Sequence, residues 1–537
     1  MEKRLIVAFF LSFAVLVVWQ KLFPSPQPDL DNITQIYINK EDTTKTSKSP
    51  SPSLKLFSPP VSSTIPKKTE TLENDLISVD FSNIGGSLDS VMIRKYGYTL
   101  PVTSMVSLEG QETQPYTLVR KTRDSITYSA RVSGLEVIKQ YKLSNNDFTV
   151  SANVTLKNLS GASQTILPSI NAYVAEMSSL DINELGRNRS LFEYAIFTPK
   201  EAIRHGNAYR FNSKNQKTGH SAVDMVSFRT RYFAAIVKPL SKISRYDVNV
   251  FSEEKMALTL TPEVEQLPAG AERSFNFVVF LGPQKLRLLQ SYQYDFDRVM
   301  AFSNWFLIDN VAKILYRFMH FIHRHVHNWG LSILILAILV NGLLYPLNSR
   351  GMRALRAQQT KMQVLQPKLN DLREKYKDNP QKLNKEMAQL YKEHHIHPMG
   401  CAGGCLPMFI QFPVFIGLYQ VLWRSVSLKG APFLWIKDLS QPDRLFLLPF
   451  SLPILGNELN ILPIVMLVLV FFQQRASSKN MQTTDPNMMA QQKMMGWMFP
   501  VMMLFIFYKI ASGLTLYFVV LYCFTLFTQV RMSKLNR

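Results

Sequence analysis

Five apolar segments occupy the chain after Gly330, and they constrain the fold more than any other feature of the sequence. They cover residues 331–347, 406–423, 461–472, 494–510 and 514–530. Crossing a bilayer as a helix takes about 20 mostly apolar residues, and only helices or closed barrels satisfy their backbone hydrogen bonds in lipid. Several segments are shorter, which requires a thinned bilayer or helices that shield one another's ends. We therefore expect a membrane α-helical bundle with five core spans.

The first 23 residues predict an N-terminal transmembrane anchor. Lys3 and Arg4 precede an apolar run from Leu5 to Trp19, which is the pattern of a signal sequence. Bulky residues follow where a signal peptidase needs small ones, so an uncleaved signal anchor is favoured over a cleaved signal. Residues 24–70 are rich in Ser, Thr, Pro and Lys, and this composition predicts a flexible linker.

Residues 71–290 predict a large antiparallel β-sandwich. In runs such as the one around Ile126 and Tyr128, apolar and polar residues alternate. A period of two gives each strand one buried and one wet face. Clusters of Gly, Asn and Asp separate the runs, as turns do. No cysteine lies between residues 24 and 330, so this domain must depend on its own core and not on disulfides.

Residues 295–327 change to a helical period. Their apolar residues fall on one stripe and their basic residues lie elsewhere, which predicts an amphipathic interfacial helix along the membrane surface. The alternative is a helix packed on the β-sandwich. The predicted stripe consists of Val299, Phe302, Phe306, Val311, Leu315, Phe318 and Ile322.

The charge of the connecting segments sets the orientation of the spans. Residues 348–400 hold 11 Lys and Arg against 5 Asp and Glu, and residues 473–493 and 531–537 are also basic. Residues 424–460 are nearly neutral, and their apolar part is broken by Pro449 and Pro453, so we expect a non-spanning periplasmic loop. Because cytoplasmic loops carry the excess of Lys and Arg, both termini are predicted in the cytoplasm and the β domain outside.

Residues 348–404 predict a cytoplasmic helical hairpin. Apolar residues recur at heptad-like steps on either side of Asn379-Pro380, as in two antiparallel helices joined by a turn. The charged outer face is either merely solvated or contacts lipid headgroups or the RNA of a ribosome. The candidate contact residues are Arg353, Arg356, Lys361, Lys368, Arg373 and Lys375.

A series of short motifs runs in order from Asn328 to about Arg531. The motifs are Asn328-Trp329-Gly330, Tyr345-Pro346-Leu347, Leu365-Gln366-Pro367-Lys368, Cys405-Leu406-Pro407 with Gln411 and Pro413, Asp485-Pro486 and Ser512-Gly513-Leu514-Thr515-Leu516-Tyr517. Each is weak alone, but their order and spacing closely resemble the YidC family of membrane protein insertases. The anchor and the large β domain are similar to the Gram-negative branch of that family.

The resemblance implies a protein of the bacterial inner membrane that inserts and folds integral membrane proteins. Its partners would be nascent membrane proteins, membrane lipids and the Sec translocon, with the ribosome as a further candidate at the hairpin. It implies no enzyme activity, catalytic residue, metal, cofactor or DNA partner. The rival interpretation is a polytopic transporter or channel with a periplasmic binding domain. That class predicts internal repeats and several charges within the spans, and we find neither.

The family also implies a hydrophilic groove among the five core helices. Asn341 stands where relatives usually carry an Arg, so the positive charge of that groove is missing here. Lys509 stands where close relatives have an aromatic residue, and a Lys within a span is usually functional. We therefore hypothesise that Lys509 replaces the missing charge; the alternative is that it reaches the periplasmic interface. The candidate groove residues are Asn341, Gln411, Lys509, Ser512, Thr515 and Tyr517.

Overall fold

The computed structural model describes residues 66–176, 192–205, 216–303, 305–377, 379–393, 401–452, 456–478 and 486–535. The predicted anchor and residues 24–65 of the predicted linker lie outside the described residues. The chain divides into two compact units after Met300, and each is described by itself. The first unit is the predicted β domain, and the second contains the helices.

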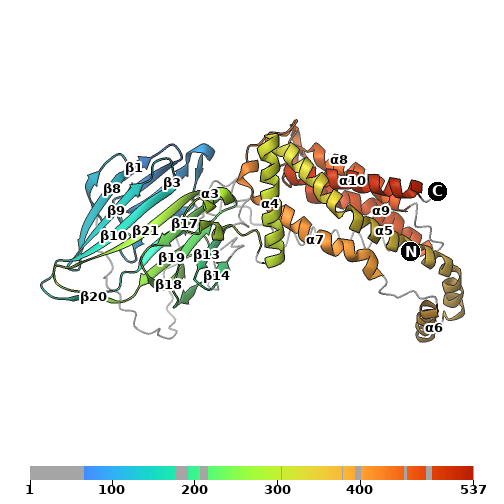
Figure 1. Ribbon diagram of the computed structural model, residues 1–537, viewed down its shortest axis with the longest axis horizontal. Helices are drawn as coiled ribbons and strands as arrows, with labels where there is room; N and C mark the ends of the chain where they lie inside the picture. Colours follow the sequence, from blue (N-terminus) through green and yellow to red (C-terminus); the bar gives the residue numbers. More distant parts are fainter. Residues whose placement is uncertain are drawn as a thin grey trace. The chain divides into compact units, whose positions relative to one another are not determined.

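The first unit is an antiparallel β-sandwich (Figure 1). Its largest sheet has nine strands in the order β14 (Ala202–His205), β13 (Glu193–Phe197), β16 (Met225–Arg229), β17 (Phe233–Pro239), β21 (Glu272–Pro283), β10 (Thr149–Asn158), β9 (Leu135–Leu143), β8 (Ser125–Val132) and β7 (Thr117–Lys121). A six-stranded sheet has the order β15 (Lys217–Gly219), β18 (Ile243–Val250), β19 (Lys255–Pro262), β12 (Ile170–Glu176) and β5 (Val102–Thr103), with β6 (Ser107–Leu108) also paired to β12. The smaller sheets are β1 (Thr69–Glu73), β2 (Ile77–Ser82), β3 (Ser87–Ile93) and β4 (Tyr98–Thr99), and β11 (Gln164–Ile166) with β20 (Glu265–Leu267).

Strands β8, β9 and β10 of the sandwich follow the period of two that the sequence predicts, whereas β13 and β16 are buried on both faces. Ile126 and Tyr128 of β8 are fully buried, whereas Thr127 between them is partly exposed. The Tyr173 hydroxyl on β12 donates a 3.0 Å hydrogen bond to the Ser227 carbonyl on β16 and so links the two large sheets. The predicted antiparallel β-sandwich is confirmed, and the regular elements of this unit begin with β1 and include the short helix α3 (Leu286–Gln290).

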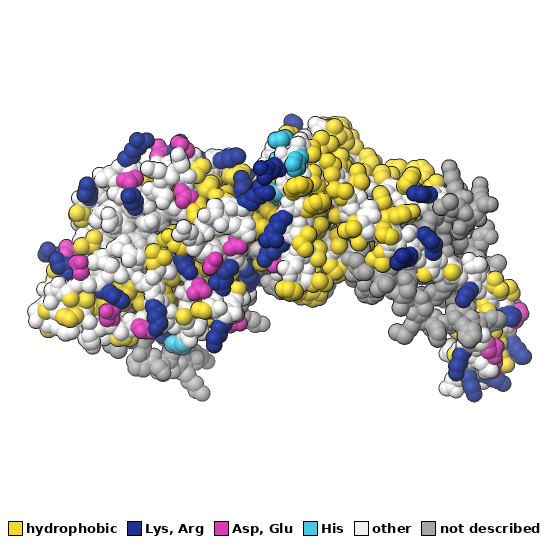
Figure 2. Space-filling view, in the orientation of Figure 1, with side chains coloured by type: hydrophobic (Ala, Val, Ile, Leu, Met, Phe, Trp, Pro, Cys, Tyr) yellow, Lys and Arg dark blue, Asp and Glu magenta, His cyan; other side chains and the backbone are white. Residues whose placement is uncertain are grey.

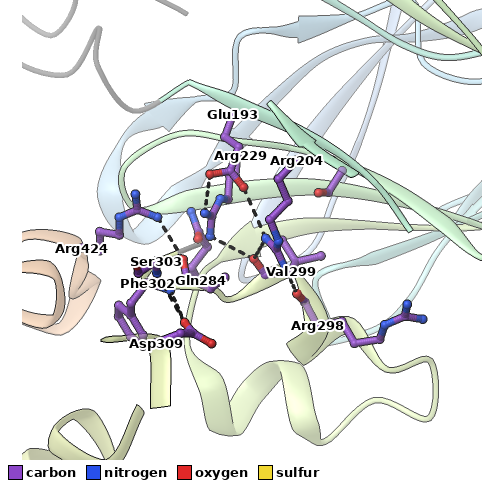
Figure 3. A network of polar contacts seen from close by, with 12 residues as sticks. Glu193, Arg204, Arg229, Gln284, Arg298, Val299, Phe302, Ser303, Asp309 and Arg424 are labelled. Carbon is purple, nitrogen blue, oxygen red and sulfur yellow. Dashed lines mark hydrogen bonds and ion pairs between the residues drawn. The ribbon is translucent and has the colours of Figure 1, made fainter. Parts of the chain in front are cut away.

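A cluster of charged residues holds the last residues of the first unit (Figure 3). The Glu193 carboxylate accepts hydrogen bonds from Arg229 at 2.6 Å and from Arg204 at 3.3 Å. Both arginines also donate to the Val299 carbonyl, at 2.9 and 3.2 Å. Bonds between a guanidinium and a carboxylate are among the strongest hydrogen bonds in proteins. Glu193 therefore holds the two arginines in place, and their bonds to the Val299 carbonyl fix the short helix η5 (Phe296–Val299) against the nine-stranded sheet.

The second unit begins with a similar set of polar contacts, made by its own helices (Figure 3). The Asp309 carboxylate accepts from the backbone N–H groups of Phe302 at 2.7 Å and Ser303 at 3.4 Å. Arg424 donates to the Ala301 carbonyl at 3.0 Å. These bonds satisfy backbone groups that no helix or sheet pairs, and so fix the path of the chain into the first helix.

The helical unit contains the five predicted apolar segments as helices. Its long helices are α4 (Phe306–Val326), α5 (Trp329–Lys375), α6 (Pro380–Glu393), α7 (Cys401–Arg424), α8 (Ile461–Ser478), α9 (Pro486–Phe507) and α10 (Ser512–Leu535). Figure 1 shows α4 lying across the ends of α5 and α7, on which it packs. Gly417 permits this close approach, because a Cβ there would stand 3.3 Å from the Ala312 backbone nitrogen.

Helix boundaries differ from the predicted spans in two places. The first span and the first arm of the predicted hairpin form one continuous helix, α5, which passes through Pro346 and Pro367. The span predicted over residues 494–510 ends too late, because α9 stops at Phe507. In the described part of the chain, two helical stretches, Trp329–Ala354 and Ser512–Arg531, are long and apolar enough to cross a membrane, while Ile461–Ala476 and Gly496–Phe507 are shorter.

The predicted apolar stripe of the amphipathic helix combined two different faces of α4. Leu315 and Ile322 belong to the buried face, whereas Phe306 and Phe318 are exposed. Val299 and Phe302 are buried but precede the helix. The helix therefore has a packed face and a second, exposed apolar stripe; the second comprises Leu307, Ile314, Phe318 and Phe321. An exposed apolar stripe on a helix with basic residues suits a membrane surface.

The apolar, proline-broken segment between α7 and α8 is a β-hairpin. Its strands are β22 (Phe446–Leu452) and β23 (Gly456–Leu459), which pair in antiparallel fashion from Phe446 opposite Leu459. The prediction that this segment does not cross the membrane as a helix agrees with this structure. Leu445, Phe446, Leu447 and Phe450 are all exposed.

Candidate functional site

Three polar side chains from three different helices meet inside the apolar helical unit. The Tyr517 hydroxyl of α10 lies beside the side-chain amides of Gln411 on α7 and Asn341 on α5. Asn341 and Tyr517 are almost completely buried, and both amide atoms of Gln411 are shielded from solvent. The sequence predicted all three as groove residues, and the structure brings them together.

This cluster has hydrogen-bonding capacity that the described protein groups do not use. The Asn341 amide donates to the Ala337 carbonyl one turn earlier, at 2.7 Å. Gln411 and Asn341 are near enough to the Tyr517 hydroxyl to interact with it. Among the described residues, however, the Tyr517 hydroxyl and both amide atoms of Gln411 have no partner at full hydrogen-bond geometry. A buried polar group without a partner costs about 1–3 kcal/mol, so this site favours a ligand that supplies donors and acceptors, such as water or a polar peptide segment.

The other two buried candidates, Ser512 and Thr515, have partners of their own. The Ser512 hydroxyl donates to the Asp438 carbonyl at 3.2 Å, and Thr515 points back to the Ala511 carbonyl at 3.4 Å. The backbone N–H of Ser512 also donates to the Gln441 carbonyl at 2.7 Å. The bonds of Ser512 anchor the start of α10 to the loop that follows α7, and so hold Tyr517 in place.

Lys509 lies outside both neighbouring helices, in the connection between α9 and α10. Its side chain is exposed. The preceding residue, Tyr508, is fixed by Asn460, whose side-chain amide donates to the Tyr508 carbonyl at 2.7 Å. The structure therefore places Lys509 in the connection at the end of the bundle where α10 begins, and not within the span that the sequence predicts for it.

The outer surface of the helical unit is strongly apolar. Figure 2 shows hydrophobic side chains over much of the visible face of the helical unit. Exposed members include Leu343 on α5, Phe472 on α8, Trp497 on α9 and Phe527 on α10. An apolar surface this wide is typical of a protein that faces lipid.

The predicted helical hairpin is formed by the second half of α5 together with α6. Buried Leu365 and Leu369 pack against Met387, Leu390 and Tyr391 across the turn. The Asn379 side chain accepts a 3.1 Å bond from the Lys382 backbone and begins α6. Figure 2 shows Lys and Arg side chains gathered over this hairpin. Of the predicted contact residues, Arg353, Lys361, Lys368, Arg373 and Lys375 are exposed, while the side chain of Arg356 lies outside the description.

Sequence reasoning missed the residues that hold the ends of α8 and α10 together. Asp443 accepts from the first two backbone N–H groups of α8, at 2.7 and 2.9 Å, and therefore caps it. Asn460 accepts from the Arg444 backbone at 2.9 Å in addition to its bond with Tyr508. An Asn directly before an apolar run is a recognisable helix-start signal, but its partner 48 residues later is not.

Comparison with known proteins assigns both units. The family model described as "60Kd inner membrane protein" matches residues 321–537, and the model described as "YidC periplasmic domain" matches residues 107–318. The membrane protein insertase YidC of Chlorobaculum tepidum is 27% identical over 99% of this chain and 95% of its own length. The protein of the same name from Syntrophus aciditrophicus is 28% identical over 96% of each chain. A crystal structure of an active YidC insertase is 19% identical, with a TM-score of 0.36 over 86% of this chain and 92% of its own. The chain therefore belongs to the YidC family of membrane protein insertases.

Proposed function

We propose that this chain inserts and folds integral membrane proteins in the inner membrane, and that the cluster of Asn341, Gln411 and Tyr517 receives the polar flank of the entering segment. The observation that carries this proposal is the unused hydrogen-bonding capacity of these buried groups. Membership of the family supports an insertase and not the rival transporter or channel.

The physical problem of insertion explains why such a cluster is useful. A polar flank that crosses hydrocarbon loses its hydrogen bonds to water, which costs several kcal/mol for each unsatisfied polar group. A buried site with free donors and acceptors offers replacement bonds part-way across, and water can share it. The apolar part of the substrate can then leave along the lipid-facing helices. No covalent bond forms or breaks in this process, so no catalytic residue is required.

The same proposal includes the topology and the partners. Both termini lie in the cytoplasm and the β-sandwich lies in the periplasm, as the charge bias of the loops indicates. The exposed basic residues of the α5–α6 hairpin then face the cytoplasm, where they contact lipid headgroups or a ribosome. We also propose that the protein works alone on short substrates and beside the Sec translocon on others, as the family resemblance implies.

Reconstitution of the full chain into proteoliposomes tests the polar cluster. The substrate is a short single-span protein with a polar N-terminal tail, and tail translocation is measured by protease protection. We expect the variant with Asn341→Leu, Gln411→Leu and Tyr517→Phe to translocate the tail severalfold more slowly, because it offers no polar bonds. A substrate with an apolar tail should be affected less.

Thr525→Val provides a matched control for this experiment. The Thr525 hydroxyl already bonds to the Leu521 carbonyl of its own helix, at 2.8 Å, so its removal takes away a polar group with no free capacity. Translocation by this variant should equal that of the unmodified chain. Equal translocation by the triple variant would refute the role of the cluster, and solute flux without insertion would refute the insertase function itself.

A further inference from the structure

The β22–β23 hairpin presents apolar side chains on both of its faces. Successive residues of a strand point to opposite faces, yet Phe446 and Leu447 are 50% and 66% exposed, and Phe450 is 59% exposed. Such a two-stranded hairpin in water would be unstable and prone to aggregate. Its surface therefore needs an apolar environment.

The base of the hairpin, in contrast, is polar and rigidly attached to the helical unit. Arg444, two residues before β22, forms a 2.9 Å ion pair with Glu458 on β23. The Tyr508 hydroxyl donates to the Glu458 carbonyl at 2.7 Å, and Asn460 bonds to the Tyr508 carbonyl. Together with the Asp443 cap on α8, these bonds fix the hairpin to the same end of the bundle at which α8 and α10 begin.

The apolar surface of the hairpin continues into the lipid-facing surface of α8. Only Asn460 separates β23 from α8, and α8 exposes Ile464, Val465 and Val468 in its first turns. The exposed Lys509 side chain follows Tyr508 directly, next to the polar base. The order of these groups matches the layers of one leaflet. The apolar side chains suit the acyl chains, and the lysine beside the polar base suits the phosphates.

The backbone of the hairpin distinguishes lipid from a protein partner. Pro449 lies within β22 and Pro453 directly follows it, and a proline has no N–H to offer an added strand. The strand is therefore a poor template for β-augmentation. Its remaining unpaired edge groups need water nearby, which excludes deep burial and places the hairpin at the level of the headgroups and upper acyl chains.

We propose that the β22–β23 hairpin is a membrane-surface anchor that inserts Phe446, Leu447 and Phe450 into the outer leaflet, with Lys509 at the phosphates. The side of the membrane rests on the proposed topology, but the insertion into lipid does not. Such an anchor would fix the depth of the bundle in the membrane and perturb the packing of that leaflet.

Spin-label accessibility tests the insertion in the full chain reconstituted in phosphatidylethanolamine–phosphatidylglycerol vesicles. Cys401, Cys405 and Cys523 are changed to serine, and a nitroxide is attached to Phe450→Cys. The control label is attached to Glu254→Cys, an exposed position on the β-sandwich. We expect the ratio of oxygen to nickel-chelate accessibility to be severalfold higher at position 450 than at position 254.

Each other outcome overturns the proposal in a recognisable way. Equal nickel accessibility at the two positions would place the hairpin in water, and low accessibility to both reagents at position 450 would place it against protein. The same measurement at Leu447→Cys guards against a local effect of one label. Labelling of Lys437→Cys by an impermeant maleimide in spheroplasts tests the topology separately. A hairpin on the cytoplasmic side of the membrane would then not be mistaken for a hairpin that fails to insert into lipid.

Discussion

Replacing Lys139 with methionine should stabilise the β-sandwich, and should do so most at low pH. Lys139 lies on β9 and is completely buried; its ammonium group donates to the Gly85 carbonyl at 2.6 Å and lies 4.6 Å from the centre of the Tyr116 ring. Burial lowers the pKa of Lys139 from 10.5 to about 7, only partly opposed by the charge of Glu112. The folded domain therefore disfavours the charged form that the unfolded chain carries.

The size of the effect follows from the difference between the two pKa values. Between pH 7 and 10.5 the unfolded chain binds a proton that the folded domain does not, so stability rises with pH in this window. At about 1.4 kcal/mol per pKa unit, the free energy of unfolding should rise by about 3 kcal/mol between pH 6.5 and 9.5. Methionine has no charge to desolvate, so Lys139→Met should lack this rise and gain about 1–3 kcal/mol at pH 6.5 after the loss of its hydrogen bond.

Pulse proteolysis of the full chain in detergent, over a urea series at pH 6.5, 8.0 and 9.5, measures this difference for the β-sandwich. Lys142→Met is the matched control, because Lys142 lies on the same strand but is largely exposed. The control should show the same pH dependence as the unmodified chain. If the free energy of unfolding rises equally between pH 6.5 and 9.5 in Lys139→Met and in the unmodified chain, the reasoning about the buried amine is refuted.

Two further substitutions probe the ends of the two units. Glu193→Gln leaves the buried Arg229 guanidinium without its carboxylate and should lower the free energy of unfolding of the sandwich by about 3–5 kcal/mol. A lower urea midpoint measures this loss. Glu73→Gln breaks only an exposed ion pair and should change the free energy of unfolding by less than about 1 kcal/mol. Asp443→Ala removes the cap of α8 and should lower the free energy of unfolding by about 1 kcal/mol. Thermal unfolding in detergent, followed by circular dichroism at 222 nm, measures this loss, and Asp443→Asn should retain most of the stability. Equal losses in the two variants would show that the cap bonds do not matter.

Part of the β-sandwich was accessible from sequence because some of its strands have one face in the core and one face toward solvent. In β8 the alternation of Ile126 and Tyr128 with polar neighbours predicts both the element and its buried face. Strands β13 and β16 are buried on both faces and show no such alternation. Helix α4 was harder, because both of its apolar stripes have the same period. Periodicity finds apolar faces but does not tell which one packs on protein and which is left to lipid.

Helix ends within the second unit depended on contacts that are distant in sequence. The apolar pattern continues to Ile510, but α9 ends at Phe507, where Asn460 binds the Tyr508 carbonyl. That bond moves Lys509 out of the helix that the sequence predicts for it. In the opposite sense, Pro346 was expected near a span end, yet α5 continues through it, with the Ser349 hydroxyl donating to the Pro346 carbonyl at 3.0 Å.

The candidate polar cluster was expected from the family resemblance, which implies a hydrophilic groove at these positions. Polar residues inside apolar runs are costly and usually functional, which agrees with that expectation. The chemistry of the cluster, however, differs from what a fixed charge would provide. An arginine at position 341 would attract an acidic flank over a distance, whereas Asn341, Gln411 and Tyr517 act only on groups within hydrogen-bond reach. In the proposed function, discrimination by charge would then fall to the basic residues of the α5–α6 hairpin. The interior of this insertase would select for hydrogen-bonding capacity alone, which suits flanks that are polar but not acidic.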